Sequence, residues 1–313
     1  MSLLVPLVAA FVLSLVLTPL ARRIAVQLDL IDHPVARSSH EKPVPFGGGF
    51  AIFVSFWTIA LALQWPPTPP LIGMLIGSGI LLTICALDDK YRLPALPRLG
   101  AQFGVGLIAY FSGVRVVQLG NPLHAMFGPE YIFMGGLEMP VTVLWIAFIV
   151  NAVNWLDGLD GLAAGVSSIA AMTLAMVAAS GGQALTVLVP AAALAGAALG
   201  FLRYNFNPAS IFMGDVGAMF LGYMLACLSV IGAVKQPTAL VLGVPLLVLG
   251  LPIYDSAMTI LKRLRAGRPI YHPDRGHLHH RLLDSGLSTR ETVLFMYGIT
   301  GLLCMIALGV WLR

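Results

Sequence analysis

Charged residues are scarce in this chain, and their scarcity excludes a soluble globular protein. Of the 313 residues, only 10% are Asp, Glu, Lys or Arg, whereas 58% are hydrophobic. Soluble domains carry about 25% charged residues. The long apolar runs instead predict a polytopic membrane protein, because each spanning helix needs about 20 apolar residues. The runs do not alternate as barrel strands do, so we expect an all-α fold.

Cysteine is also rare, which removes a further set of functions. The three cysteines, Cys85, Cys227 and Cys304, lie far apart in apolar runs and show no CxxC or other paired spacing. This pattern does not indicate a disulfide framework or a thiolate zinc site. We interpret all three as small apolar packing residues.

Apolar runs separated by polar segments predict about ten transmembrane helices in one catalytic domain, residues 1–313. The predicted spans are 2–20, 47–64, 70–87, 98–112, 139–153, 161–179, 183–201, 216–233, 238–260 and 292–311. No basic residue precedes the first span, so we interpret it as retained rather than as a cleaved signal. All but three of the 18 Lys and Arg follow odd-numbered spans. The positive-inside rule makes that side cytoplasmic and places both termini outside.

Acidic residues gather on the same predicted side, in five polar segments. These are residues 29–49, 87–102, 151–165, 203–222 and 254–286.

The third segment, NAVNWLDGLDGLAAG, places two amides and two acids at three-residue intervals between apolar runs. They are Asn151, Asn154, Asp157 and Asp160. On one continuous helix these side chains would fan over half the circumference. The glycines at 158 and 161 favour a turn, which would let all four face one site. Capping of the next helix by Asp157 or Asp160 is the ordinary alternative, but it explains one acid and not both.

The combined segments carry the ligands of a hard metal and of phosphate. Asp88, Asp89 and Asp215 each have an ordinary interpretation as a membrane-edge acid or a helix cap. Together with the acids and Asn154 of the third segment they form an oxygen-rich, thiol-free set that suits Mg²⁺ or Mn²⁺. Basic side chains in the same segments suit phosphate oxygens. The pattern indicates phosphoryl transfer with a lipid substrate at the membrane surface.

The ordered segments RSSHEKPVPFGGG, LDDKYRLPALPRLGAQ, NAVNWLDGLDGLAAG, NFNPASIFMGDVG and HPDRGHLHHRLL resemble the polyprenyl-phosphate N-acetylhexosamine-1-phosphate transferases of glycosyltransferase family 4. The resemblance covers about residues 29–286. It implies a multi-pass enzyme of the bacterial inner membrane with its active site on the cytoplasmic face. The implied reaction transfers HexNAc-1-phosphate, most commonly GlcNAc-1-phosphate, from a UDP-N-acetylhexosamine to undecaprenyl phosphate with Mg²⁺ or Mn²⁺. UMP is released, and the product starts a cell-envelope glycan such as O-antigen or teichoic acid.

The same motifs imply roles for single residues. The metal ligands would be Asp215 and Asn154. The catalytic acids would be Asp88, Asp89 and Asp157, with Asp88 as the base for the lipid phosphate. The nucleotide would contact Asp160, Phe212 and Asn205. The phosphates would be held by Lys42, Arg98, Arg275, His277, His279 and His280. Asp255 also recurs in the family and receives no role from the sequence.

Several alternatives stay open at this point. The spacing HLHH, in place of three adjacent histidines, favours the hexosamine branch over the phospho-MurNAc-pentapeptide transferases of peptidoglycan synthesis. A secondary transporter would place its acids near the midplane between matched halves, which this chain lacks. Direct attack and a covalent intermediate are both compatible with the motifs. We expect no nucleic-acid partner, and a homodimer is one of the open oligomeric states.

Overall fold

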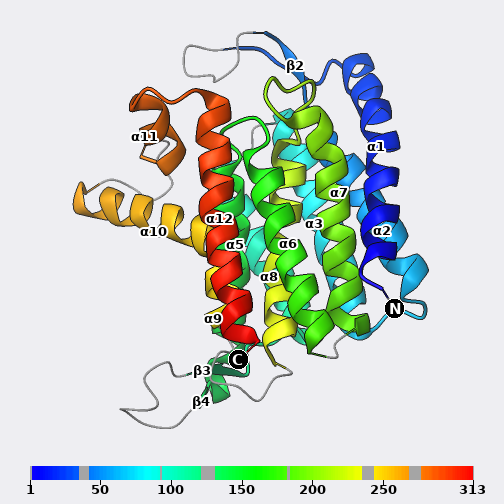
Figure 1. The fold of residues 1–313 in the computed structure, drawn as a ribbon, viewed down its shortest axis with the longest axis vertical. Helices are drawn as coiled ribbons and strands as arrows, with labels where there is room; N and C mark the ends of the chain where they lie inside the picture. Colours follow the sequence, from blue (N-terminus) through cyan, green and yellow to red (C-terminus); the bar gives the residue numbers. More distant parts are fainter. Residues whose placement is uncertain are drawn as a thin grey trace.

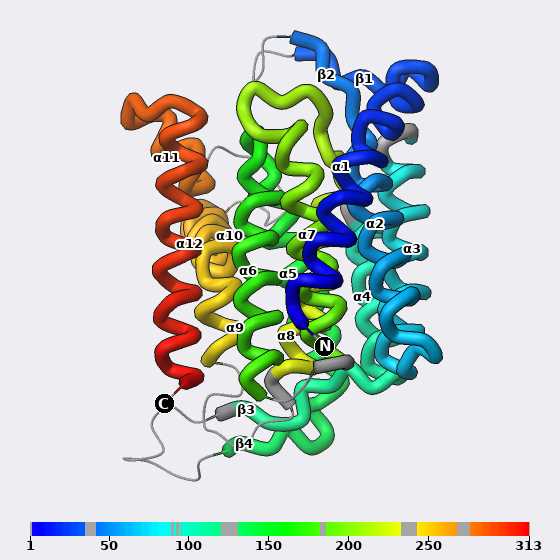
Figure 2. The backbone as a smooth tube through the Cα atoms, turned by 45° about the vertical axis from the view of Figure 1, so that its right-hand side comes forward, coloured from blue at the N-terminus to red at the C-terminus, as the bar shows by residue number. Residues whose placement is uncertain are grey.

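The computed structural model describes residues 2–34, 42–91, 94–120, 131–181, 184–234, 243–267 and 276–312. These residues form a bundle of helices with two short strand pairs at its opposite ends (Figures 1 and 2). The helices of the first half are α1 Leu4–Gln27, α2 Gly48–Leu63, α3 Pro69–Tyr91, α4 Ala95–Phe111, α5 Glu138–Leu156 and α6 Leu162–Ser180. Those of the second half are α7 Val189–Asn205, α8 Gly214–Val234, α9 Gly243–Val248, α10 Gly250–Arg265, α11 Leu278–Asp284 and α12 Thr289–Trp311.

The strands form two antiparallel pairs. One pair joins β1 Ile31–Asp32 to β2 Val44–Pro45, and the other joins β3 Gln118–Gly120 to β4 Tyr131–Phe133. Helix α1 begins and α12 ends at the same end of the bundle as β3 and β4 (Figure 1).

Seven of the described helices are long and apolar enough to cross a membrane, which confirms an all-α polytopic membrane protein. They cover Leu4–Gln27, Pro69–Asp88, Gly135–Leu156, Leu162–Ser180, Thr186–Asn205, Gly214–Gly232 and Thr289–Trp311. Helix α2 is apolar but shorter, at 16 residues. The count of ten spans and the assignment of both termini to the outside stay predictions.

The expected ninth span, residues 238–260, does not form one continuous helix among the described residues. Helix α9 ends at Val248, and α10 begins at Gly250 and projects sideways out of the bundle instead of running along it (Figure 1). Pro252 in the first turn of α10 lacks the amide hydrogen that a continuous helix would require at this position. The break directs the basic end of α10 away from the bundle.

Helices α6, α7 and α8 form the interior, because 78%, 78% and 83% of their spans are buried, against 22% for α1. Small residues allow this close packing. A Cβ added to Gly196 or Gly200 of α7 would lie 2.1 Å from the Leu7 carbonyl oxygen or 2.5 Å from that of Phe11 on α1. Between membrane helices, such close backbone approach replaces the hydrophobic driving force available in water.

The segment before α2 pairs with the loop before α8, and this contact shapes the end of the bundle that holds the polar motifs. The Phe212 amide donates to the Pro45 carbonyl at 2.9 Å, and the Gly49 amide donates to the Met213 carbonyl at 3.0 Å. A Cβ on Gly49 would lie 2.3 Å from the backbone nitrogen of Gly217. The glycine triplet therefore lets the starts of α2 and α8 touch.

Candidate active site

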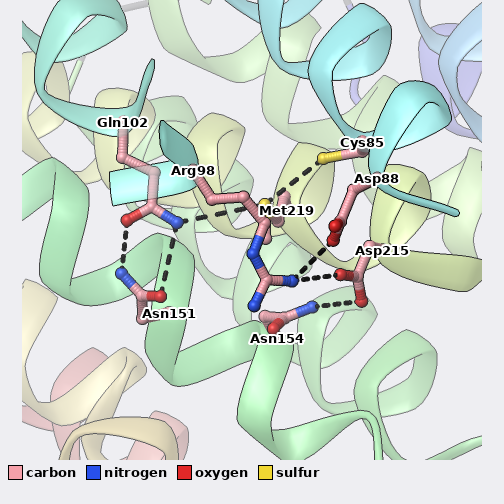
Figure 3. A network of polar contacts seen from close by, with 8 residues as sticks. All are labelled: Cys85, Asp88, Arg98, Gln102, Asn151, Asn154, Asp215 and Met219. Carbon is pink, nitrogen blue, oxygen red and sulfur yellow. Dashed lines mark hydrogen bonds and ion pairs between the residues drawn. The ribbon is translucent and has the colours of Figure 1, made fainter. Parts of the chain in front are cut away.

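Four polar residues from four helices meet at one point, which we call the carboxylate centre: Asp88 of α3, Arg98 of α4, Asn154 of α5 and Asp215 of α8 (Figure 3). The Arg98 Nη1 lies 2.7 Å from the Asp88 Oδ2 and 2.9 Å from the Asp215 Oδ2. The Asn154 Nδ2 donates to the Asp215 Oδ1 at 3.0 Å. Residues more than a hundred positions apart in the sequence are thus in direct contact.

The carboxylate centre fits a hard divalent cation that shares its coordination with other ligands. Two carboxylates and one amide supply oxygens only, and a single guanidinium offsets one of the two negative charges. Magnesium typically takes one or two carboxylates and keeps water or substrate phosphate on its remaining positions. The side chains of Arg98 and Asp215 are each 31% exposed, which leaves room for such ligands. Within the described ranges, no three His, Cys, Asp or Glu residues form a complete protein cage for a metal.

The turn between α5 and α6 has the shape that its glycines predict. Helix α5 ends at Leu156, and Gly161, with φ of +82°, precedes α6 as its N-cap. Since no side chain caps α6, the capping interpretation of Asp157 and Asp160 is wrong.

The carboxyl of Asp157, at the start of this turn, has a raised pKa. Burial, followed by the charges of Asp215 and Asp160, raises the pKa of this carboxyl to about 7. Desolvation and like charges both disfavour an ionised carboxylate. A cation or a basic group next to Asp157 would reverse part of this effect, so the turn attracts positive charge.

Asp160 and Asn205 join this turn to the α7–α8 loop. The Asp160 Oδ2 accepts hydrogen bonds from the Asn207 side chain at 3.0 Å and from the Ala209 amide at 2.9 Å. The buried Asn205 side chain accepts from the Gly161 amide at 3.1 Å and donates to the Ile211 carbonyl at 3.0 Å. Both side chains make hydrogen bonds to backbone groups of the turn or the loop. The predicted nucleotide contacts of Asp160, Asn205 and Phe212 stay predictions.

A second cluster, which we call the histidine arm, consists of α10, α11 and the residues 276–277 that precede α11. The His277 Nδ1 lies 2.8 Å from the Asp255 Oδ2. The His277 and His279 rings stack at 5.7 Å with 9° between their planes. A Cβ on Gly158 would lie 2.5 Å from the His279 Nε2. The arm therefore packs directly on the turn that carries Asp157 and Asp160.

His279 is buried in a way that keeps it neutral. Burial, followed by the nearby His280, lowers the pKa of His279 to about 3. Its Nδ1 is buried and has no hydrogen-bond partner. A neutral imidazole carries one N–H donor and one acceptor nitrogen. An unsatisfied buried nitrogen beside an acidic turn is typical of a site that a ligand completes.

The remaining predicted residues are not part of the carboxylate centre as the structure describes it. Arg275 lies outside the described residues, and so does the side chain of Asp89. Lys42 is exposed near β2. The ring of His280 lies 4.3 Å from that of His279.

One polar contact beside the carboxylate centre has no counterpart in the predicted roles. The Gln102 Nε2 donates to the Asn151 Oδ1 at 3.3 Å, and the Asn151 Nδ2 donates back to the Gln102 Oε1 (Figure 3). Gln102 follows Arg98 by one helical turn, and Asn151 precedes Asn154 by almost one turn. This spacing could have predicted that Gln102 and Asn151 lie near the carboxylate centre, since residues three or four positions apart share a helix face.

A helical membrane protein with clustered carboxylates, a guanidinium and histidines at one end has the composition of a phosphate-handling membrane enzyme. Residues 71–233 match the family described as Glycosyl transferase family 4. The chain is 39% identical over 295 residues to the probable undecaprenyl-phosphate N-acetylglucosaminyl 1-phosphate transferase of Bacillus subtilis (strain 168), covering 93% of this chain and 81% of that protein.

Two further relatives agree. The decaprenyl-phosphate N-acetylglucosaminephosphotransferase of Mycobacterium tuberculosis (strain ATCC 25618 / H37Rv) is 33% identical over 324 residues, covering 94% of this chain and 78% of that protein. The undecaprenyl-phosphate alpha-N-acetylglucosaminyl 1-phosphate transferase of Salmonella typhimurium is 26% identical over 296 residues, covering 93% and 79%. The chain belongs to glycosyl transferase family 4, and the family predicted from the motifs is confirmed.

Proposed function

We propose that this protein transfers N-acetylglucosamine 1-phosphate from a UDP-linked donor to a polyprenyl phosphate such as undecaprenyl phosphate, with release of UMP. The relatives are named as transferases of N-acetylglucosamine phosphate that act with undecaprenyl or decaprenyl phosphate. The observation that carries the proposal is the contact of Arg98 with both Asp88 and Asp215. It gathers an anion-binding group and two metal-type ligands from separate helices at one point, as phosphoryl transfer requires.

The protein's own residues divide the work as follows. Arg98 has five N–H donors in a planar fork, so it can bind phosphate oxygens while it keeps a carboxylate partner. Asp88, 2.7 Å from Arg98, accepts the remaining proton of the lipid phosphate. This demand is small, because a phosphomonoester has a second pKa of about 6. The acceptor oxygen then attacks the β-phosphorus of the donor in line, and the bond from that phosphorus to UMP breaks.

The residues present fit a divalent cation, Mg²⁺ or Mn²⁺, held by Asp215 and Asn154. When bound, it supplies neutralisation of the diphosphate charge that otherwise opposes departure of UMP. The reaction breaks one diphosphate linkage and forms another, so its free-energy change is small and the reverse reaction is measurable.

We place the site at the cytoplasmic leaflet of a bacterial inner membrane. The segments that carry the carboxylate centre and the histidine arm also carry most of the Lys and Arg, and the positive-inside rule assigns such segments to the cytoplasm. A UDP-sugar, which is a cytoplasmic metabolite, then reaches the site without crossing the bilayer.

The test is an assay of purified full-length protein with undecaprenyl phosphate, UDP-GlcNAc and Mg²⁺. We expect metal-dependent UMP and a lipid-diphosphate-GlcNAc product identified by mass, and excess UMP should regenerate UDP-GlcNAc from that product. UDP-GalNAc and UDP-MurNAc-pentapeptide serve as competing donors. Preference for the pentapeptide donor would assign the protein to the peptidoglycan branch. Absence of metal-dependent UMP with every UDP-HexNAc donor would refute the proposal.

A further inference from the structure

Asp255 is a buried carboxylate to which neither the motifs nor the proposed reaction gives a task. It lies on α10 and is 3% exposed. Its Oδ2 is 2.8 Å from the His277 Nδ1, and its Oδ1 accepts a hydrogen bond from the Leu278 amide at 2.6 Å. Each oxygen thus has its own partner on the segment that begins α11. Burying a carboxylate is costly unless it is paired in this way.

We infer that Asp255 is the positioning residue of the histidine arm: it accepts the Nδ1–H of His277 and so leaves the Nε2 as the ring nitrogen that faces the diphosphate of the donor, to which the protonated ring donates its Nε2–H. The inference rests on the proposed function, because it takes a nucleotide-sugar diphosphate as the ligand.

The hydrogen on the Nδ1 follows from the chemistry of the pair. A carboxylate only accepts hydrogen bonds, so the Nδ1 that faces Asp255 must carry hydrogen. Among the described residues, the Thr259 hydroxyl oxygen also lies 3.5 Å from that nitrogen. A carboxylate on one ring nitrogen sets the orientation of the imidazole and the task of the other nitrogen.

The second bond from Asp255 fixes the backbone. His277 is the N-cap residue of α11 and makes no side-chain cap of its own. The Leu278 amide, the first of the helix, is instead bound by Asp255 on a different helix. One side chain therefore sets both the ring of His277 and the start of α11, which carries His279 and His280.

The fixed ring lies near the end of α5, the helix that supplies Asn154 to the carboxylate centre. It is 6.0 Å from the ring of Trp155, the residue directly after Asn154. The guanidinium of Arg263, from α10, lies over the same indole at 5.5 Å. His277 and Trp155 thus bring the arm to the end of α5, and His279 contacts the next turn at Gly158. Displacing His277 would move the arm at the point where it adjoins the end of α5.

His279 provides a comparison within the arm. It stacks on His277, but its Nδ1 has no hydrogen-bond partner, whereas the same atom of His277 faces a carboxylate. Two stacked rings therefore differ in whether their Nδ1 has a hydrogen-bond partner. Asp255 accounts for the difference.

The experiment compares Asp255→Asn with the unchanged enzyme, both purified at full length. The substituted amide is isosteric and can still accept from Leu278, but it presents N–H instead of an acceptor to His277. We expect kcat/KM for UDP-GlcNAc to fall about 10- to 100-fold, the range typical of residues that orient a functional histidine. The loss should appear as a higher KM for UDP-GlcNAc, with the KM for undecaprenyl phosphate unchanged. Asp29→Asn, at an exposed acid outside the carboxylate centre and the histidine arm, is the matched control and should behave as the unchanged enzyme.

A double variant separates positioning from a merely structural role. If Asp255 acts through His277, then adding Asp255→Asn to His277→Asn should cost nothing more. Additive losses, or an unchanged KM for UDP-GlcNAc in the single variant, would overturn the inference.

A spectroscopic readout does not need activity. Nitrogen-15 NMR of the unchanged protein labelled at histidine, with the His277 signal assigned by its loss in His277→Asn, should show hydrogen on the Nδ1 of His277. An unprotonated Nδ1 would overturn the inference. If the unchanged protein shows this hydrogen but no transferase activity, then the proposed function fails while the Asp255–His277 pairing stands.

Discussion

The carboxylate centre and the histidine arm are built on different parts of the molecule. The centre takes its four residues from four helices of the bundle, and one of them, α8, is 83% buried over its span. The arm lies on α10 and α11, neither of which is long and apolar enough to be a candidate span. Buried helices fix the positions of atoms closely, as a metal and an attacking phosphate require. An arm beside the bundle suits reversible binding of a soluble nucleotide. We therefore expect damage to the centre to reduce turnover, and damage to the arm to weaken donor binding.

The largest effect should come from Asp215→Asn, which tests the centre. The amide keeps the shape of the side chain but removes the charge that faces Arg98 and the proposed metal. We expect kcat to fall about 10³-fold, comparable to the loss of a major electrostatic contact to the transition state. Initial rates over a range of Mg²⁺ concentrations measure the effect. A kcat within tenfold of the unchanged enzyme would remove Asp215 from the centre of the mechanism.

The arm is tested by Gly158→Ala. The added methyl would lie 2.5 Å from the His279 Nε2, so the ring must move. A displacement of about 1 Å at a catalytic group can cost about 10²-fold in rate, and we expect a loss of that order in kcat/KM for UDP-GlcNAc, mainly through KM. Gly298→Ala on α12, where the added Cβ meets open space, is the matched control. A loss confined to kcat would contradict the division between arm and centre.

Much of the fold could be predicted from hydropathy, because long apolar runs become helices wherever their neighbours lie. The run at 139–153 became α5, and the run at 161–179 became α6. The ninth span could not be predicted in the same way. Hydropathy averages composition over a window, so it does not register the break between α9 and α10, where Pro252 lies in the first turn of the second helix.

The site could be predicted as a set but not as a network. Acids that follow alternate apolar runs must gather at one end of the bundle, which is why Asp88, Asp157 and Asp215 could be grouped from sequence. The bonds among them depend on the rotation of each helix about its axis, which composition does not report. The contact of Arg98 with two carboxylates and that of Asp255 with His277 were therefore not predicted.

A smaller effect should come from Gln102→Leu, which removes the amide pair between α4 and α5 without touching a charge. The Asn151 Nδ2 keeps its bond to the Ala147 carbonyl at 2.7 Å, so mainly the Asn151 amide oxygen is left without its partner. We expect the free energy of unfolding to fall by about 1 to 3 kcal/mol, with a decrease in kcat of less than tenfold. Thermal unfolding in detergent and initial rates measure the two effects. Gly100→Ala, on the same helix with open space at its Cβ, should not destabilise the protein.

The smallest effect should come from Ser288→Ala, which alters the cap of α12, a helix that belongs to neither cluster. The Ser288 Oγ accepts from the Glu291 amide at 3.3 Å, and the Ser288 amide donates to the Glu291 carboxylate at 2.8 Å, which together form a capping box for α12. Loss of such a cap costs about 1 kcal/mol of stability. Because this loss resembles that of Gln102→Leu without altering either cluster, kcat and both KM values should stay within twofold of the unchanged enzyme. A clear fall in kcat with Ser288→Ala would mean that turnover follows overall stability, and the kinetic differences between centre and arm would then need correction for it.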